Sequence, residues 1–476
     1  MTKAIRKTVL AATLVITVAG CAVNPSTGER QLLLVSQDQE IQMGREADPQ
    51  IIATMGLYPD SSLQRYMQQF GERLAATTVK PDLPWTFRVL DDHVVNAFAL
   101  PGGFNYVTRG ILAHMNSEAQ LAAVVGHEIG HVTARHSAAQ MSRAQLAQVG
   151  LVAGVILAPQ LADFAGAASA GMGLLFLKFG RDDERQSDDL GLQYMVAAGF
   201  DPRPAPDVFR MLERVSAAQG GGSTPEWLST HPNPANRAER LEQAIAELNL
   251  SYSGRVVGRA EYLARLDNMV YGPNPREGFF RDNVFLHPEL AFQFTFPSGW
   301  RTINQRQAVV GVNSDQTAII QVQLAEGGSA SAAAGAFFGQ EGITGRPSGS
   351  RINGHTAAGG EFTAATEQGQ LAGAVNFVEY NGNVYQLLGY ATAQGWSSSS
   401  GTVRSSLGSF DRLTDRSALD AQPQRLDIVT VDRAMSLSEF NQRYPSAVSL
   451  DEVALLNQVD PGSRIAAGTA VKRVVQ

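Results

Sequence analysis

The stretch Val124-Val125-Gly126-His127-Glu128-Ile129-Gly130-His131 contains the pattern H-E-x-x-H, and the interpretation of the whole 476-residue chain begins from it. If the segment is helical, His127 and His131 are four residues apart and project from one face. Two imidazoles at that spacing can hold one Zn²⁺, and Glu128 then lies where it can deprotonate a zinc-bound water. Apolar residues recur at helical spacing, so we expect a buried helix. The alternative is an ordinary buried helix with two hydrogen-bonded histidines.

A catalytic zinc needs a third protein ligand and an open position for water. His136 is excluded, because five residues after His131 it should point away from the ligand face. Glu184, which lies on the next well-formed helix, is the better candidate among the remaining residues. Asp188, one helical turn later, can accept a hydrogen bond from a ligating imidazole.

His231 precedes a proline in the loop before a helix expected at 235–249. Charge that develops on the substrate carbonyl oxygen needs a donor besides the metal, and His231 is our candidate. His231 could instead take the open zinc position as a fourth ligand and hold the enzyme latent. The third alternative is a turn residue with no role in the site.

Four motifs follow one another along the chain: Asn96-Ala97-Phe98-Ala99-Leu100-Pro101-Gly102-Gly103, His127-Glu128-Ile129-Gly130-His131, Glu184-Arg185-Gln186-Ser187-Asp188 and His231-Pro232. Together they resemble the HtpX-like zinc metalloprotease family, a gluzincin family, in its BepA-like bacterial lipoprotein branch. The resemblance covers about residues 22–250. It implies a third ligand at the first Glu of an E-x-x-A-D type motif, which falls on Glu184. Ser187 stands where the family commonly has Ala, and Gln186 where many members have Glu.

The resemblance also implies an activity. We expect a zinc-dependent endopeptidase with one Zn²⁺ per chain, acting on unfolded or misassembled envelope polypeptides in periplasmic quality control. The alternative is a chaperone or scaffold lipoprotein with little proteolysis, but retention of Glu128 as a general base favours the enzyme. A third hypothesis makes the protein mainly a glycan-binding module that works through its C-terminal tail.

The segment from Gly102 to Val107 is expected to be an extended edge with little side-chain bulk near its start. A substrate peptide can add to such an edge as a further strand. Gly102, Gly103 and Phe104 are therefore candidate substrate contacts, and Asn96 is another.

Residues 1–20 have a basic start and an apolar run, which is typical of a secretory signal. The segment ends Val18-Ala19-Gly20-Cys21, which resembles a bacterial lipobox. That resemblance implies cleavage before Cys21, a lipid on its sulfur, and membrane attachment facing the periplasm. Ala22 favours the outer membrane by the usual sorting rule. The alternative is a plain signal peptide with an incidental cysteine.

The chain has a formal net charge of −7, which argues against a nucleic-acid partner because phosphate binding needs a basic surface. Cys21 is its single cysteine, so no internal disulfide can form. The long stretch 149–179 is rich in Ala, Gly and Leu and is interrupted by Pro159. We expect two packed helices there rather than a transmembrane segment, with a mobile flap or membrane-touching hairpin as the functional alternative.

The fold class expected is α+β. A mainly helical zincin-type protease domain with a small edge-strand sheet should span residues 36–271, after a tether at 21–35 and with a capping box of Ser36 and Gln39 at its start. Alternating apolar residues and the hairpin signal Asn381-Gly382 indicate a β-rich α+β domain at 280–415, without a cluster of His, Cys or paired acids. After a linker, the β-α-α-β tail at 426–476 loosely resembles the LysM glycan-binding module, which implies peptidoglycan as a partner.

Overall fold

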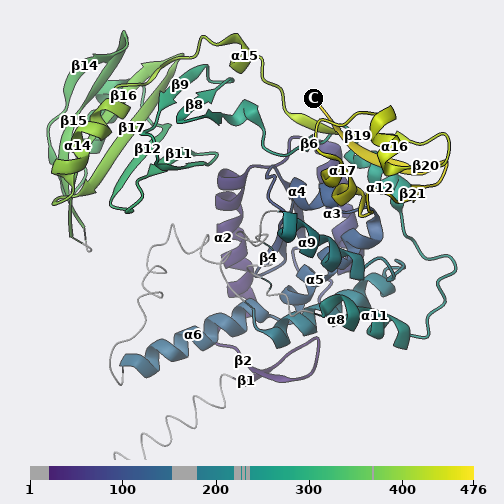
Figure 1. The fold of residues 1–476 in the computed structure, drawn as a ribbon. Helices are drawn as coiled ribbons and strands as arrows, with labels where there is room; N and C mark the ends of the chain where they lie inside the picture. Colours follow the sequence, from purple (N-terminus) through teal and green to yellow (C-terminus); the bar gives the residue numbers. More distant parts are fainter. Residues whose placement is uncertain (1–20, 153–178, 219–226, 228–230, 232–235, 367–368) are drawn as a thin grey trace, which may run out of the picture. The chain divides into compact units, whose positions relative to one another are not determined.

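The computed structural model describes residues 21–152, 179–218, 227, 231, 236–366 and 369–476. The chain divides into two compact units (Figure 1). The first comprises the chain up to Ile52, Gly56–Gly272 and Gln424–Gln476. The second comprises Pro273–Pro423 and the short stretch Ala53–Met55.

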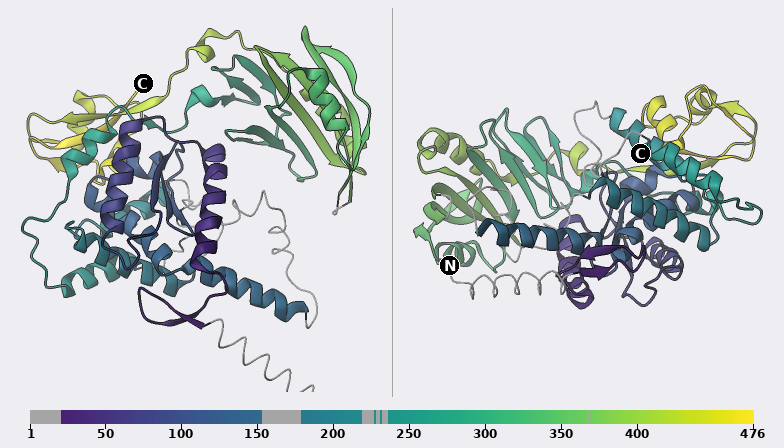
Figure 2. Two further views of the ribbon diagram at one scale, coloured as in Figure 1. Left: turned by 180° about the vertical axis from the view of Figure 1, so that it is seen from behind. Right: turned by 90° about the horizontal axis from the view of Figure 1, so that it is seen from below.

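Helices form most of the first unit (Figure 2). Their bounds are α2 (Gln37–Met55), α3 (Ser61–Ala75), α4 (Arg109–His114), α5 (Glu118–Thr133), α6 (His136–Val152), α8 (Arg181–Ala197), α9 (Pro206–Ala218), α11 (Arg237–Glu247) and α12 (Arg259–Leu266). The capping box expected at Ser36 and Gln39 is present at the start of α2. It satisfies backbone N–H groups that the first turn leaves without partners.

A three-stranded sheet of the first unit has the order β3 (Thr86–Leu90), β5 (Phe104–Thr108), β4 (Ala97–Leu100). β3 runs parallel to β5, and β4 runs antiparallel to it. Helix α3 packs closely on β3 because Gly71 has no side chain: a Cβ there would lie 2.2 Å from the ring of Phe87. The same sheet packs against α5 through β4.

The segment at 21–35, expected to be a tether, is a folded part of the first unit. β1 (Cys21–Val23) pairs with β2 (Arg30–Leu32) as an antiparallel hairpin. Leu33 and Val35 then pack against Ala138 and Ala139 of α6. The apolar run Leu32–Val35 at the end of this segment provides the contact, whereas the turn residues before it favour a simple tether.

The tail, expected to be separate, also belongs to the first unit. β22 (Ala470–Val475), β19 (Gln424–Thr430) and β6 (Val270–Tyr271) form one sheet, while β20 (Met435–Ser436), β21 (Arg464–Ile465), α16 (Leu437–Arg443) and α17 (Leu450–Asn457) complete the tail. Leu426, Leu456 and Val474 join the main hydrophobic core. The buried Lys472 donates from Nζ to the carbonyl oxygens of Ala113 and Met115, at 2.6 and 2.9 Å.

The second unit is built mainly from strands. Its larger sheet has the order β10 (Arg301–Asn304), β11 (Ala308–Val312), β12 (Ala318–Leu324), β17 (Asn383–Thr392), β16 (Gly369–Tyr380), β15 (His355–Thr366), β13 (Ile343–Gly345), and β14 (Ser348–Ile352) also pairs with β15. The predicted turn at Asn381 and Gly382 joins β16 to β17, with φ of 48° and 78°. Both values lie in the left-handed region that this two-residue hairpin requires.

A second sheet of this unit has the order β18 (Asp411–Arg412), β9 (Phe292–Thr295), β8 (Val284–His287), β7 (Phe279–Arg281). Helices α13 (Ala330–Phe338) and α14 (Trp396–Leu407) pack on the larger sheet, and the short α15 (Arg416–Leu419) lies in the expected linker. The α+β fold class is confirmed. Among the described residues, none of the helices is long and apolar enough to cross a membrane.

Candidate metal centre

Helix α5 carries the H-E-x-x-H pattern and is buried along nearly its whole length. Ser117 caps it by accepting a hydrogen bond from the backbone N–H of Gln120. The Gln120 side chain accepts in turn from the backbone N–H of Asn116. The cap fixes where the helix begins, so His127 and His131 fall on the same face.

Small residues bring α8 against α5. A Cβ on Gly191 of α8 would lie 2.8 Å from the backbone nitrogen of His127, and a Cβ on Gly130 would lie 3.0 Å from the carbonyl oxygen of Ser187. Larger side chains at these positions would push the helices apart. The close approach places Glu184, in the first turn of α8, opposite the two histidines of α5.

Four buried side chains converge: His127, His131, Glu184 and His231. Nε2 of His127 lies 3.0 Å from Nε2 of His131 and 3.3 Å from Nδ1 of His231. Carboxylate oxygens of Glu184 lie 3.4 Å from Nε2 of His131 and 2.9 Å from Nδ1 of His231. Ligands about 2.0–2.1 Å from a tetrahedral metal are roughly 3.3 Å apart, so these spacings match one ion held by four ligands.

The donor set fits zinc. Imidazole nitrogens with one carboxylate oxygen are ligands that zinc takes in catalytic sites. The fourth donor, His231, lies where a catalytic site would keep its open position. Among the described residues this is the one group of three or more His, Cys, Asp or Glu arranged to hold a metal ion. Zinc is therefore the cofactor that the site is built for.

Asp188 has the position predicted for it. Its Oδ1 lies 2.9 Å from Nδ1 of His127, which leaves Nε2 of that ring for the metal. Burial lowers the pKa of His127, but hydrogen bonds to Asp188 and Glu184 outweigh it and raise that pKa to about 9. In the metal-free protein His127 is thus the cationic partner of these carboxylates, and a metal ion would replace its proton.

Arg237 is a site residue that we did not predict from the sequence. It is fully buried, and its guanidinium donates to both carboxylate oxygens of Asp188 and, at 3.0 Å, to Glu184. Burial raises the pKa of Glu184, yet its electrostatic interaction with His231 and its hydrogen bonds to His127, His131 and His231 hold that pKa well below its usual range. A signal was available: Arg237 lies four residues before Leu241, on the apolar face of α11, where a charge needs buried acidic partners.

Glu128 is held by Trp227, a second residue absent from our predictions. Trp227 donates from Nε1 to Oε1 of Glu128 at 3.2 Å and stacks on the ring of His231. Burial raises the pKa of Glu128, although the nearby histidine charges lower it. Nothing in the sequence pairs an isolated tryptophan with a residue ninety-nine positions earlier, so this contact had no local signal.

The expected substrate edge at Gly102–Val107 is wrong. β5 is the central strand of its sheet: Phe104 pairs with Thr86 of β3 and with Leu100 of β4. Gly102 is needed for packing instead, because a Cβ there would lie 2.5 Å from the Cα of Ile41. Gly103 likewise lies in the turn before β5, with φ of 105°.

β4 is an edge strand of this sheet: it pairs with β5 on one side and with no strand on the other among the described residues. Asn96 directly precedes it and is buried, and its Oδ1 has no hydrogen-bond partner among the described residues. β4 lies beside α5. The sequence predicted an open strand edge, but we assigned that edge to β5 instead of β4, because strand order depends on long-range pairing.

His136 lies outside the four-residue cluster. We expected its side chain to point away from the cluster, but it faces His131 instead. Its Nδ1 lies 3.0 Å from Nδ1 of His131, and both side chains are buried. The helix is interrupted between them: Arg135 has φ of 61°, so the helical rotation that we extrapolated does not continue to His136.

Several predicted features lie outside the described residues. These are the signal segment at 1–20 and almost all of the stretch at 149–179. Cys21 is the first residue of β1.

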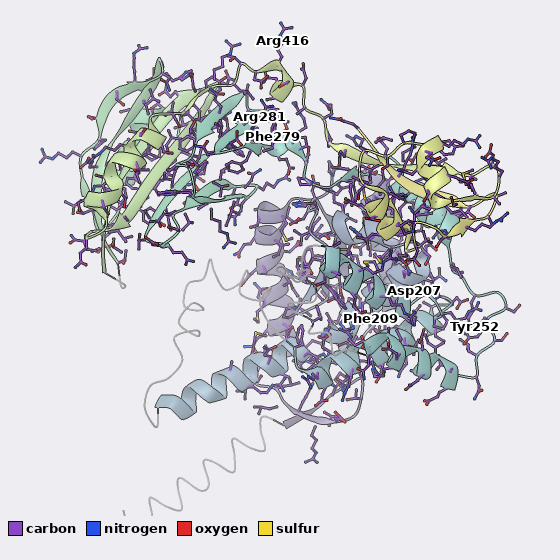
Figure 3. All side chains as sticks on the ribbon, viewed as in Figure 1. Asp207, Phe209, Tyr252, Phe279, Arg281 and Arg416 are labelled. Carbon is purple, nitrogen blue, oxygen red and sulfur yellow. The ribbon has the colours of Figure 1, made fainter. Side chains whose placement is uncertain are left out.

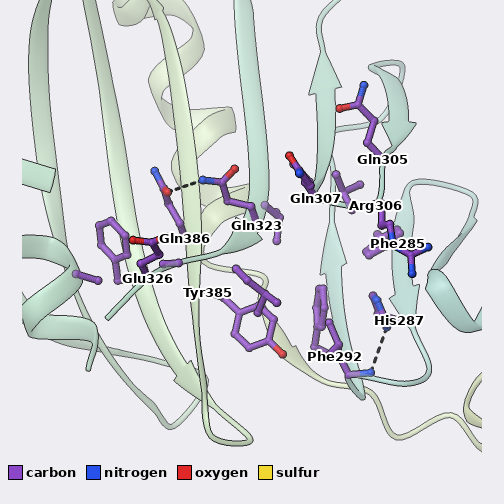
Figure 4. A pocket seen from close by; sticks show the side chains of 18 of the residues that line it. Phe285, His287, Phe292, Gln305, Arg306, Gln307, Gln323, Glu326, Tyr385 and Gln386 are labelled. Carbon is purple, nitrogen blue, oxygen red and sulfur yellow. Dashed lines mark hydrogen bonds between the residues drawn. The ribbon is translucent and has the colours of Figure 1, made fainter. Parts of the chain in front are cut away.

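The second unit holds a cavity of about 770 Å³, away from any such cluster in the part of the chain described (Figure 4). Buried aromatic residues Phe285, Phe292 and Tyr385 line it, with the amides of Gln323 and Gln386 hydrogen-bonded to each other at 2.8 Å. This lining provides neither a nucleophile with a base nor a metal-ligand set. Among the described residues, the candidate metal centre therefore lies in the first unit.

Comparison with known proteins agrees with this geometry. Residues 61–245 match the description Peptidase family M48. The chain is 35% identical over 232 residues to the mitochondrial metalloendopeptidase OMA1 of Schizosaccharomyces pombe, covering 47% of this chain and 66% of that protein. It is 32% identical over 222 residues to the beta-barrel assembly-enhancing protease of Escherichia coli, covering 45% of each.

The chain thus spans about half to two thirds of the length of these relatives. Among solved structures, cyanobacterial PsbP from Synechocystis aligns with 28% of this chain at 11% identity and a TM-score of 0.23. The relationship to HtpX-like and BepA-like zinc metalloproteases, predicted from four motifs, is confirmed. Residues 61–245 are therefore a Peptidase family M48 domain.

Proposed function

We propose that this chain is a zinc-dependent endopeptidase that hydrolyses peptide bonds of unfolded or misassembled polypeptides. The observation that supports this most strongly is the convergence of His127, His131 and Glu184, with Glu128 on the same helix as the two histidines. A site that bound metal for structure alone would have no use for a general base beside it.

When bound, zinc would polarise the substrate carbonyl and acidify the attacking water. The chain's own residues handle the proton. Glu128 accepts it from the water and returns it to the leaving amine, and the Trp227 hydrogen bond holds the carboxylate in place for both transfers. Asp188 and Arg237 keep the His127 ring oriented.

His231 supports a latent state within this proposal. Its Nδ1 is among the four converging donors, at the position that substrate and water need. We infer that His231 leaves this position before catalysis, rather than serving there as the donor to the carbonyl oxygen. His231→Ala should then retain zinc and cleave an unfolded substrate faster than wild type. Zinc retention with slower cleavage would favour the alternative, in which His231 stabilises charge on the substrate.

The substrate class follows from an open strand edge and from the names of relatives. β4 lies beside α5 with one edge unpaired among the described residues, and backbone pairing along such an edge reads little sequence. The Escherichia coli relative is named a beta-barrel assembly-enhancing protease. We propose that envelope proteins which fail to fold or assemble are the substrates.

We propose a lipid anchor at Cys21 that attaches the chain to the outer membrane on its periplasmic side. The lipobox-like Val18-Ala19-Gly20-Cys21 sequence and the signal-like residues before it support this. The tail supports a weaker proposal, peptidoglycan binding. Cys21→Ser should move the protein from the membrane fraction to the soluble periplasm, and an unchanged membrane fraction would reject the anchor.

The enzyme assignment is tested by digesting casein with wild type and Glu128→Gln, with zinc measured in both. The substitution keeps the size and the zinc ligands but removes the base, so cleavage should fall by about 10²–10⁴-fold with zinc unchanged. Glu326→Gln, in the cavity of the second unit, is the matched control and should cleave like wild type. Equal cleavage by Glu128→Gln would reject the general base. Zinc binding without cleavage by any of them would favour a scaffold or chaperone.

A further inference from the structure

A chain of buried and partly buried hydrogen bonds runs from the N-terminal hairpin to a metal ligand. It begins at Asn24, which is buried and lies one residue after β1. Nδ2 of Asn24 donates to Oε1 of Gln186 at 3.1 Å, and Nε2 of His136 lies 2.8 Å from the same oxygen. Nδ1 of His136 then lies 3.0 Å from Nδ1 of His131.

Backbone groups fix the direction of this chain at its outer end. The N–H of Ser26 lies 2.9 Å from Oδ1 of Asn24 and can only donate. The carbonyl oxygen of Ala134 lies 3.3 Å from Nδ2 of Asn24 and can only accept. The Asn24 amide therefore has one orientation, and it presents a donor to Gln186.

Each following step has one solution. The atom of Gln186 facing that donor must be the carbonyl oxygen, so Nε2 of His136 must carry a hydrogen to donate to it. Nε2 of His131 lies in the metal cluster and needs its lone pair there, so Nδ1 of His131 carries the hydrogen, and Nδ1 of His136 must present a lone pair to it. That lone pair accepts from Nδ1–H of His131, which leaves the lone pair of His131 on Nε2, the atom in the metal cluster.

We infer that His136, Gln186 and Asn24 are positioning residues that set the tautomer of the zinc ligand His131. The hairpin that begins at Cys21 is therefore part of the metal site. The inference deepens the proposed function, because it concerns the same zinc site.

Ser187 fits the same account. Its Oγ lies 3.3 Å from Nδ1 of His136, farther than the imidazole of His131, so it is the weaker competitor for that lone pair. The two positions at which this chain departs from the resembled family pattern, Gln186 and Ser187, both contact His136. A carboxylate at position 186 would accept the same two hydrogen bonds, so Gln186→Glu should preserve the chain.

The test is the zinc dissociation constant of the full chain, measured by competition with a chromogenic chelator. His136→Leu and Gln186→Leu should weaken zinc binding by about 10–100-fold, the usual effect of removing a partner of a ligating histidine. Asn24→Ala should weaken it less, and Gln186→Glu should restore wild-type affinity. If position 186 had only a structural role, Gln186→Glu and Gln186→Leu should have similar zinc affinities.

Gln31→Ala is the matched control. Gln31 lies on the same hairpin and donates to the same Ala134 carbonyl at 3.1 Å, but it makes no bond in the chain to His131. It should bind zinc like wild type. Gln186→Leu and His136→Leu with wild-type zinc affinity, or Gln31→Ala as weak as Asn24→Ala, would overturn the inference. Because zinc affinity is the readout, a chain that binds zinc but cleaves nothing fails the proposed function alone.

Discussion

The two units of this protein treat buried polar groups differently. The first unit buries ionisable side chains such as Glu184, Asp188 and Arg237 next to the histidine cluster. In the described part of the second unit, Ser406 is the one polar side chain that is equally buried. The cavity there is lined by aromatic rings, amides and the less buried ionisable side chains of Glu277, His287, Arg306 and Glu326. Burying charge is expensive unless it is paired or bound to metal. The free-energy cost of burying charge is found in the first unit, which contains the candidate metal centre.

The largest difference should come from removing one member of a buried charge network. Arg237→Met leaves Glu184 and Asp188 without their guanidinium, so the free energy of unfolding of the first unit should fall by about 3–5 kcal/mol. Urea unfolding of the zinc-free protein measures it.

The matched change in the second unit is Arg281→Met. Arg281, labelled in Figure 3, pairs with Asp415 at 2.6 Å, but both side chains are substantially exposed. The loss should be much smaller than for Arg237→Met, because solvent screens an exposed pair. Similar losses for the two variants would break the comparison.

Removal of zinc should affect the thermal stability of the two units differently. A metal that binds the folded first unit stabilises it by about 3 kcal/mol when free zinc is one hundred times its dissociation constant. Chelation should therefore lower the melting temperature of the first unit and leave the second unchanged. Tryptophan fluorescence of Trp227, beside the cluster, and of Trp396, on α14 of the second unit, can follow each unit in single-tryptophan variants. A shift in both transitions would place zinc elsewhere or couple the units.

A fall in pH should lower the free energy of unfolding of both units, by a smaller amount than Arg237→Met or the removal of zinc. Burial lowers the pKa of His114 in the first unit and of His287 in the second to about 4. Both are neutral when folded, whereas the unfolded chain takes up a proton below about pH 6.5, so stability is lost as the pH falls from 6.5 towards 4. For the fully buried His114 this loss is about 2 kcal/mol between pH 7 and 5.

His114→Gln cannot titrate, so its first unit should lose about 2 kcal/mol less than wild type over that interval. The partly exposed His287 should contribute less, and His287→Gln should remove its smaller share from the second unit alone. An equal pH dependence of wild type and His114→Gln would show that burial does not suppress the protonation of His114.

The sequence predicted what local spacing can encode. His127, His131 and Glu184 were found from helical periodicity and a motif, and the Asn381 turn from its backbone requirement. Local spacing does not encode long-range pairing. Two features depend on residues far apart in the chain: the strand order that makes β5 central, and the contact of Trp227 with Glu128. Arg237 lay between these cases, because a charge on an apolar helical face was visible and its acidic partners could have been proposed.

The central claim is that one zinc ion binds between α5 and α8. An anomalous difference map of crystals of the full chain, recorded at the zinc absorption edge, tests it directly. We expect a single peak bounded by Nε2 of His127, Nε2 of His131 and the carboxylate of Glu184. Zinc-grown crystals without a peak among these atoms, or with the peak on other ligands, would contradict the account.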